Sequence, residues 1–539
     1  MPVTRRAQDD ARTGISVVVN GKTAAGCHRA RRLEGMSDQK DTRGKNRSRQ
    51  PQSKEFKKFI GENWGPRPTD GYERSGAAPY ALRRRVKLGE KFKGVRLVVP
   101  AGALVVRNND CDYRFRPHSA FSHLTGLGTD LIPDAVLVLN PVREGETGEG
   151  EGTHTATVFF RPRASRASEE FYADSRYGEL WVGVRPSLEE FERMCAIPCA
   201  HLETLPDLLA KDAGQVQIAM ISTSDSQAAA MVNQVREQAG IDPDAAKDLD
   251  NLLEEATSEL RLTKDDWEIE EMRKAVAATK EGFEEAIRSF PRAVKHFRGE
   301  RVVEGAFGAR AREVGNGLGY DTIAASGEHA ATLHWINNDG QVREGDLILI
   351  DAGVELDSLY TADITRTLPI NGHFNEVQRR VYQAVLDAAD AAFDQANQPG
   401  CIFSDVHSAA MRVIAQRLDE WGLLPVSWEE SLQEDGQYHR RWMVHGTSHH
   451  LGIDVHDCAQ ARREMYNGAR LEPGMIFTIE PGLYFRKDDL AVPPEYRGIS
   501  VRIEDDILVG PGGKCERISQ NIPRTVADVE AWIARVQAE

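Results

Sequence analysis

The chain has 539 residues, 40% of them hydrophobic, so it can bury more than one core and we expect two or more domains. Its formal net charge of −15 gives no support to nucleic-acid binding, which requires a basic surface. No apolar run approaches the ~20 residues that cross a membrane, and the early apolar stretch at 15–19 is too short for a secretory signal. Seven scattered cysteines, an odd number, favour the reducing cytoplasm over a disulfide framework.

The amino-terminal stretch differs in composition from the rest of the chain. Residues 1–52 hold 12 Lys and Arg against 5 Asp and Glu, and they show neither helical nor strand periodicity. We therefore expect a disordered basic tail over residues 1–53. A second methionine, Met36, is an alternative translation start, because it opens the polar stretch MSDQKDTRGKN.

Residues 54–258 are expected to form a mixed α/β domain. Four apolar runs between turn signals predict strands, at residues 95–106, 135–140, 156–160 and 216–221. The acidic, glycine-rich stretch at 143–152 predicts an exposed loop between two of these strands. A helical pattern, SLEEFERM, begins at Ser187.

Residues 259–539 are expected to form a second domain, in which helices alternate with strands. Thr263 and Asp266 predict the start of a helix. Its apolar positions follow steps of three and four, at Ile269, Met272, Val276, Thr279, Phe283 and Ile287. A second amphipathic helix is predicted from about Asn375 to Gln395.

One pattern occurs twice in this second domain. Residues 344–353 read EGDLILIDAG and residues 472–482 read EPGMIFTIEPG, so each apolar run follows a turn glycine and ends at a carboxylate, Asp351 or Glu480. Such a run predicts a buried strand. An ionised carboxylate at the end of a buried strand is costly unless it is paired or holds a metal. The repeat therefore indicates a metal site built from two similar halves.

Further acids and imidazoles follow in the stretches DAGVELDSLYTADITRT, HGTSHHLGIDVHD and SVRIEDD. The candidate ligands share oxygen or imidazole donors, and they are Asp351, Asp363, His449, Glu480 and Glu504. This set suits a hard or borderline divalent ion and differs from the cysteine-rich ligands of structural zinc. Four carboxylates leave excess negative charge around one ion, so we expect two ions that share bridging carboxylates. His450, beside His449, should point the opposite way in an extended segment.

These motifs resemble those of aminopeptidase P (Xaa-Pro aminopeptidase), in the pita-bread superfamily of creatinase, prolidase and methionine aminopeptidase. The similarity covers about residues 70–525. It implies an α+β fold with two domains, an amino-terminal creatinase-like mixed α/β domain and a carboxy-terminal pita-bread catalytic domain. The segment DYRFRPHSAFSHLTGL resembles the start of the family's amino-terminal domain, and we assign it no catalytic role.

The resemblance also implies roles for the candidate ligands. Asp351 resembles the ligand of one metal only, Asp363 and Glu504 resemble bridging ligands, and His449 and Glu480 resemble ligands of the second metal. One spacing differs, because Asp363 lies twelve positions after Asp351 where the family usually has eleven. A bulge or a longer turn near residues 356–360 would accommodate the extra residue without moving either ligand.

Other polar residues resemble groups that act on substrate. His334 and His456 resemble the histidines that contact the scissile carbonyl, and Glu480 is placed to transfer a proton. His445 resembles a substrate-pocket histidine. Arg502 resembles an arginine beside the metal carboxylates, which we group with the substrate-binding residues.

The expected activity is release of the amino-terminal residue from peptides with proline in second position, by a dinuclear metallopeptidase. We expect Mn2+, with Co2+, Zn2+ or Fe2+ as alternatives. We also expect the protein to be a cytoplasmic homo-oligomer, either a dimer or a tetramer. We expect it to bind neither membranes nor nucleic acids. Two alternatives stay open: an Xaa-Pro dipeptidase (prolidase), which shares the ligands, and a metal-free pita-bread binding module, which the intact ligand set disfavours.

Overall fold

The computed structural model describes residues 51, 53–129, 131–143 and 145–539. The predicted tail, including Met36, lies outside the described residues except at its end. Among the helices of the described part, none is long and apolar enough to cross a membrane.

A five-stranded mixed sheet forms the centre of the amino-terminal domain. Its strands, in the order β6-β5-β4-β1-β7, are Cys199–His201, His154–Phe160, Val136–Pro141, Val95–Pro100 and Gln217–Met220. The central pairings are antiparallel, whereas β7 and β6 pair in parallel at the edges. Successive side chains alternate between two hydrophobic clusters. Leu97 and Val99 face one cluster, and Val98 faces the other. Both faces of the sheet are therefore covered, as expected for a mixed α/β domain.

The helices of this domain are α1 (Lys54–Gly61), α2 (Ala78–Lys91), α3 (Ser119–Thr125), α4 (Glu170–Ala173), α5 (Glu179–Val182), α6 (Leu188–Cys195), α7 (Leu205–Ala210), α8 (Ser226–Gln238) and α9 (Pro243–Leu260). Side chains of α2, α3, α6, α7, α8 and α9 belong to the two clusters that cover the sheet, whereas α1, α4 and α5 contribute none. The helix predicted from Ser187 is confirmed as α6, because Ser187 and Glu190 form a capping box. The predicted domain boundary at 258/259 falls in the last turn of α9, and it stays a prediction.

One predicted strand of this domain was too long. The run at 95–106 is a strand only to Pro100, and two short strands follow, β2 (Val106–Asn108) and β3 (Cys111–Asp112). The chain turns at Gly102, whose φ of +100° lies in a region that favours glycine. The apolar run therefore continues past the point where the backbone leaves the sheet.

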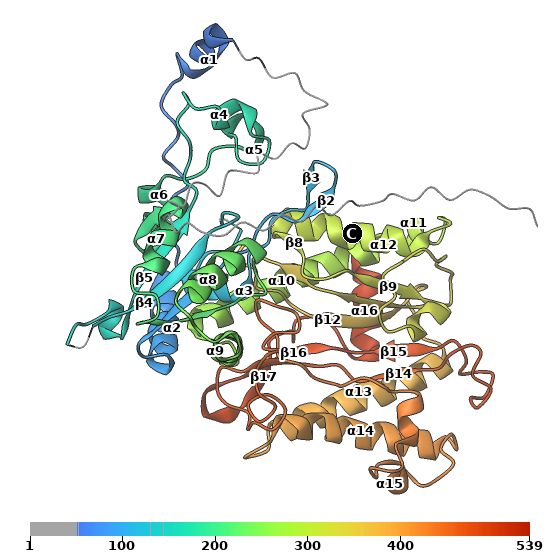
Figure 1. Cartoon of the computed structure of the whole chain (residues 1–539). Coiled ribbons are helices and arrows are strands. Elements are labelled where there is room, and N and C mark those ends of the chain that lie inside the picture. The colour runs from blue at the N-terminus through green and yellow to red at the C-terminus, as the bar shows by residue number, and fades with distance from the viewer. Residues whose placement is uncertain (1–50, 52, 130, 144) are drawn as a thin grey trace, which may run out of the picture. The chain divides into compact units, whose positions relative to one another are not determined.

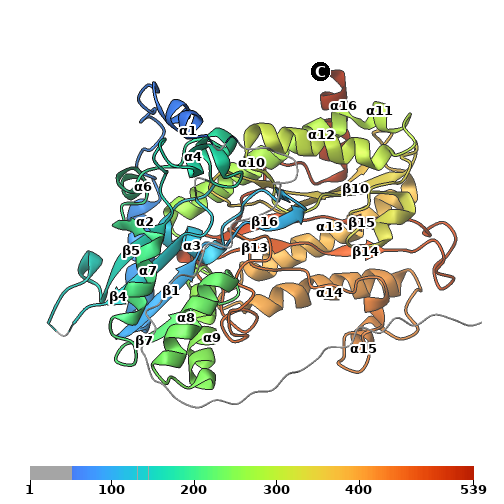
Figure 2. The ribbon, with the colours of Figure 1, turned by 45° about the horizontal axis from the view of Figure 1, so that its top comes forward.

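Antiparallel strands between helices form the carboxy-terminal domain (Figures 1 and 2). The strands are β8 (Gly317–Leu318), β9 (Ile323–Ser326), β10 (Leu347–Ala352), β11 (Val354–Glu355), β12 (Ile364–Pro369), β13 (Ile476–Ile479), β14 (Gly482–Tyr484), β15 (Ser500–Arg502), β16 (Asp505–Val509) and β17 (Cys515–Arg517). The helices are α10 (Asp266–Arg288), α11 (Phe290–Ala293), α12 (Gly299–Val314), α13 (Glu376–Ala396), α14 (Phe403–Glu420), α15 (Trp428–Ser431) and α16 (Val526–Ala538).

The repeated sequence pattern forms equivalent strands in this domain. Gly345 and Gly474 both adopt positive φ, +89° and +93°, just before the buried strands β10 and β13. The helix predicted from Asn375 is confirmed as α13, with Asn375 as its cap. The start of α10 was predicted two residues too early. Its cap is Asp265, whose side chain forms a capping box with Glu268.

The hairpin that joins β10 to β12 contains the extra residue. Asp351 lies opposite Thr365 on the neighbouring strand, and Glu355 bridges Thr361 in the same register. The register is therefore continuous, and the insertion lies in the tip at 356–360, where Leu359 adopts a φ of +71°. Of the two predicted explanations, the longer turn is correct.

Candidate functional site

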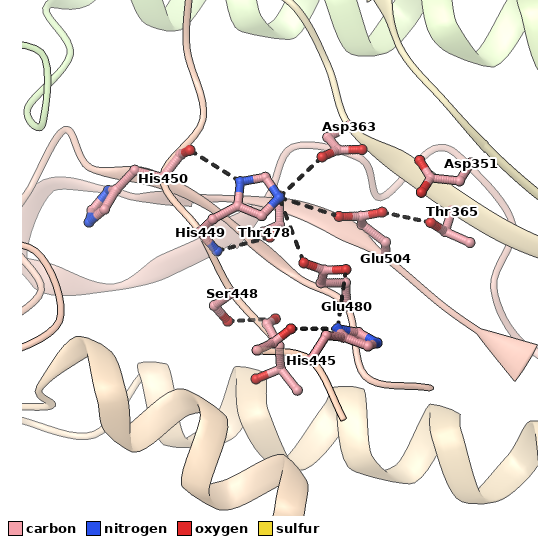
Figure 3. Close-up of polar contacts among 12 residues, drawn as sticks. Asp351, Asp363, Thr365, His445, Ser448, His449, His450, Thr478, Glu480 and Glu504 are labelled. Atoms are coloured by element: carbon pink, nitrogen blue, oxygen red, sulfur yellow. Dashed lines mark hydrogen bonds and ion pairs between the residues drawn. The ribbon is translucent and has the colours of Figure 1, made fainter. Parts of the chain in front are cut away.

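Three of the candidate carboxylates converge on an imidazole nitrogen of a fourth candidate, His449 (Figure 3). Nε2 of His449 lies 3.2 Å from Oδ2 of Asp363, 3.7 Å from Oε1 of Glu480 and 4.0 Å from Oε1 of Glu504. Asp363, His449 and Glu504 each offer one ligand atom within 4.8 Å of the others. Three separate chain segments thus bring their donors to one point.

Strand ends position these side chains. Asp351 lies within β10, Asp363 directly precedes β12 and Glu480 directly follows β13. Glu504 lies between β15 and β16. Because the strands are fixed by backbone pairing, carboxylates at their ends have little freedom to move away from one another.

Tyr320 links the fifth candidate, Asp351, to this group. Its hydroxyl lies 2.7 Å from Oδ1 of Asp351 and 2.5 Å from Oδ1 of Asp363. Burial, together with the charges of both aspartates, raises the pKa of Tyr320 well above its usual value, so it stays protonated and donates. Tyr320 therefore holds the two aspartates side by side.

The carboxylates carry more buried negative charge than the protein neutralises. Glu504 Oε2 accepts a hydrogen bond from Thr365, at 2.7 Å, but its buried Oε1 has no hydrogen-bond partner among the described residues. Burial and the neighbouring carboxylates raise the pKa of Glu504 well above its usual value, and burial raises the pKa of Glu480 to about 7. A cation would relieve this repulsion. The unpartnered oxygen and the excess charge therefore fit a metal centre.

His449 and Asp363 shift each other's pKa. Burial alone would lower the pKa of His449, but the hydrogen bond and the charge of Asp363 raise it to about 9. Burial would raise the pKa of Asp363, but the contact with His449 keeps it below its usual value. In the metal-free protein the imidazole is therefore protonated near pH 7, and its positive charge lies beside the carboxylates.

Arg502 contacts the candidate ligand Asp351. Its guanidinium donates to Asp351 Oδ2 at 2.5 Å, to Thr365 Oγ1 at 3.0 Å and to the Tyr484 hydroxyl at 3.2 Å. The side chain is buried. These contacts agree with the predicted place beside the metal carboxylates, and the grouping of Arg502 with the substrate-binding residues stays a prediction.

Two of the predicted histidines, His456 and His445, lie beside the cluster. The ring of His456 lies 4.5 Å from the ring of His449, nearly perpendicular to it. Nδ1 of His445 lies 2.6 Å from the Gly446 carbonyl and 3.8 Å from Oε2 of Glu480. His334 is exposed, in the loop after β9. As predicted, the side chain of His450 points away, and it stacks on the ring of Phe403.

The comparisons with known proteins cover both domains. The profile of the aminopeptidase P amino-terminal domain matches residues 81–219, and that of metallopeptidase family M24 matches residues 270–511. Xaa-Pro aminopeptidase 1 of Streptomyces coelicolor is 44% identical over 90% of this chain and 93% of its own length. The chain belongs to the aminopeptidase P family of metallopeptidases. Xaa-Pro aminopeptidase of Escherichia coli is 30% identical over 85% of this chain and 98% of its own length.

Solved structures of aminopeptidase P share the fold. A histidine-to-alanine variant of the Escherichia coli enzyme has a TM-score of 0.74 at 28% identity, covering 87% of this chain and 100% of that one. The zinc-substituted Escherichia coli enzyme in complex with product has a TM-score of 0.73 at 28% identity, covering 86% and 99%. The predicted creatinase-like and pita-bread domains are thus confirmed. As a member of this metallopeptidase family with this donor set, the chain binds divalent metal.

Sequence reasoning missed several residues of the centre. Tyr320 is a single aromatic residue in a short connection, without a pattern that marks it. Asp506 lies in the quoted SVRIEDD stretch but was not singled out, although its carboxylate is buried and accepts from the backbone N–H of Asp363 at 3.3 Å. Thr365 was likewise visible only as part of a strand.

Proposed function

We propose that this member of the aminopeptidase P family removes the amino-terminal residue from peptides with proline in second position, using two divalent ions. We expect Mn2+, with Co2+, Zn2+ or Fe2+ as alternatives. The observation that carries the proposal is the cluster of four carboxylates and one imidazole, with an unpartnered Glu504 oxygen, in a chain similar to Xaa-Pro aminopeptidases over both domains. The predicted cytoplasmic location and homo-oligomer, a dimer or tetramer, belong to the same proposal.

The proposed ligand roles follow from the arrangement of the donors. Asp363 and Glu504 would be the ligands shared by the two ions; Asp363 lies between Tyr320 with Asp351 on one side and His449 on the other. Asp351 would then be a ligand of one ion, and His449 and Glu480 would be ligands of the second. Sharing two carboxylates between two ions balances the charge of four acids better than one ion does.

The ions, when bound, supply Lewis-acid chemistry that polarises a carbonyl and acidifies water. Glu480 is the residue proposed to take the proton of the attacking water and pass it to the leaving nitrogen. Its carboxylate lies between His449, at 3.7 Å, and His445, at 3.8 Å, so it faces both the ligand cluster and the substrate pocket. Asp351, by contrast, is held by Tyr320 and Arg502.

The histidines are proposed to bind the reacting peptide. His456 and His334 donate to the scissile carbonyl as negative charge develops on its oxygen. His445 is neutral near pH 7, because burial and then the charge of Arg502 lower its pKa to about 3. Its Nδ1 donates to the Gly446 carbonyl, which leaves Nε2 to accept from the Tyr484 hydroxyl at 2.7 Å. This fixed imidazole and the Tyr484 ring are proposed to line the proline pocket.

The test is a matched set of peptides. Proline's nitrogen carries no N–H before cleavage, so a site for this leaving group must recognise the ring. We expect rapid release of the first residue from Xaa-Pro-Xaa peptides and scarcely any from the same peptides with alanine in second position, measured by mass spectrometry. Equal rates would refute the specificity. Cleavage of Xaa-Pro dipeptides alone would instead indicate a prolidase.

A further inference from the structure

Two chain segments supply most of the proposed metal ligands. The first is the hairpin of β10, β11 and β12, with Asp351 and Asp363. The second, here called the histidine loop, is residues 449–457, with His449 at its start and His456 near its end. The backbone N–H of Asp457 donates to the carbonyl of His450 at 2.9 Å, so the loop closes on itself. Catalysis requires these two segments to keep a fixed separation.

One arginine of the amino-terminal domain contacts both segments. Arg116 lies in the segment DYRFRPHSAFSHLTGL, shortly before the start of α3. Its Nε donates to Oε2 of Glu355, in the hairpin, at 2.8 Å. Its Nη2 donates to the carbonyl of Ile453, in the histidine loop, at 2.8 Å, and lies 3.4 Å from Oδ1 of Asp454. The two ends of a single guanidinium therefore join the two segments.

Neighbouring contacts hold the same loop. The hydroxyl of Ser119 donates to Oδ1 of Asp454 at 2.6 Å. Arg261, directly after α9, donates to Oδ1 of Asp457 at 2.8 Å, and Asp457 directly follows His456 in the chain. The backbone N–H of Thr361, in the hairpin, donates to the carbonyl of Gly452 at 3.0 Å. The histidine loop thus rests on the amino-terminal domain as well as on the hairpin.

We propose that Arg116 is a positioning residue, which sets the separation between the hairpin ligands and the histidine loop. The proposal rests on the proposed metallopeptidase function. The arginine side chain is 38% exposed but that of Glu355 is only 6% exposed, so loss of the arginine also leaves a buried carboxylate without its cationic partner. The planar guanidinium presents donors in fixed directions that a lysine lacks. Its loss should therefore also change the geometry of the centre.

The matched control is Arg114, two residues earlier in the same segment. It is also exposed and also contacts the carboxy-terminal domain, where it donates to the carbonyl and side-chain oxygens of Asn316 at 2.7 and 2.9 Å. Within the part of the chain that the structure describes, no hydrogen bond or ion pair joins it to the histidine loop. Comparing Arg116→Met with Arg114→Met therefore separates the bridging contact from the loss of a surface arginine between the domains.

Mn2+ binding to metal-stripped protein, followed by calorimetry, is the first readout. For Arg116→Met we expect Kd to rise by about 10-fold, the lower range for loss of a group that supports metal ligands. We also expect kcat on a prolyl tripeptide to fall by about 10-fold while KM changes less than twofold. Arg114→Met should match the wild type in each quantity, and Tm is measured for both variants so that lost stability is separated from lost geometry at the centre.

Two further variants keep the test decisive. Arg116→Lys keeps the charge but cannot reach Glu355 and Ile453 together. Relative to Arg116→Met, it should therefore restore less than half of the change in log Kd for Mn2+. Ser119→Ala should weaken Mn2+ binding in the same direction by a smaller factor. Full recovery with lysine, or equal Mn2+ affinity of Arg116→Met and Arg114→Met, would overturn the proposal.

The outcome is distinguishable from failure of the proposed function. If the wild-type enzyme does not cleave prolyl peptides, the proposed substrate is wrong, and the Mn2+ comparison still decides the role of Arg116. If the wild-type enzyme cleaves them and Arg116→Met binds Mn2+ normally with normal kcat, the function stands and the positioning role fails.

Discussion

Replacing Glu504 with alanine is expected to abolish turnover and to lower the number of bound ions, while the fold is retained. Glu504 is 1% exposed, and its Oε1 faces Asp363 and His449 without a hydrogen-bond partner among the described residues. A carboxylate in this environment destabilises the metal-free fold, since burial and neighbouring charges raise its pKa. Its removal should therefore not lower the Tm of metal-free protein.

The measurement combines elemental analysis of bound metal, hydrolysis of a prolyl tripeptide and thermal unfolding. Glu516→Ala is the matched control, because Glu516 is a partly exposed acid on β17 that pairs with Arg273, away from the centre. The control should retain both metal and activity. If Glu504→Ala keeps two ions per chain and wild-type turnover, the bridging role is wrong.

Replacing His456 with alanine is expected to lower kcat by ~10²–10³, as for loss of an oxyanion donor, with bound metal unchanged. The ring of His456 lies edge-on to that of His449, at 4.5 Å, yet His456 is not among the donors grouped around the candidate ions. Burial, followed by the charge of His449, lowers its pKa, so near pH 7 it donates as a neutral imidazole.

Metal content measured beside kcat separates the possible roles of this histidine. His373→Ala, at a side chain that is 77% exposed, controls for loss of a histidine as such and should behave as wild type. A His456→Ala enzyme that loses its ions together with its activity would be evidence that His456 is a ligand. Unchanged kcat would remove it from the reaction altogether.

The residues of the centre that could be predicted from sequence are those that belong to a pattern within a short stretch of the chain. A turn glycine, a short apolar run and a terminal carboxylate occupy seven residues in each copy, so β10 with Asp351 and β13 with Glu480 could be found from the chain alone. Short-range patterns also gave the wrong start for α10. Thr263 and Asp265 are both suitable cap residues, and only the capping box with Glu268 distinguishes them.

The parts that sequence could not predict depend on residues far apart in the chain. Tyr320 reaches Asp363 across 43 positions, and Arg116 reaches Ile453 across 337. A single tyrosine or arginine shows no periodicity, so nothing local marks its partner. Arg502 was found, but its burial against Asp351 follows from the packing of β15 and could not be read from the motif.

The central claim is a centre of two ions that works on prolyl peptides, and a metal titration tests it most directly. Metal-stripped enzyme, at a concentration well above the Kd for Mn2+, is titrated with Mn2+ while hydrolysis of an Xaa-Pro-Xaa tripeptide is followed. Because four carboxylates and one imidazole provide ligands for two ions, activity should rise to a plateau at two equivalents per chain. Full activity at one equivalent, or full activity without metal, would contradict the account.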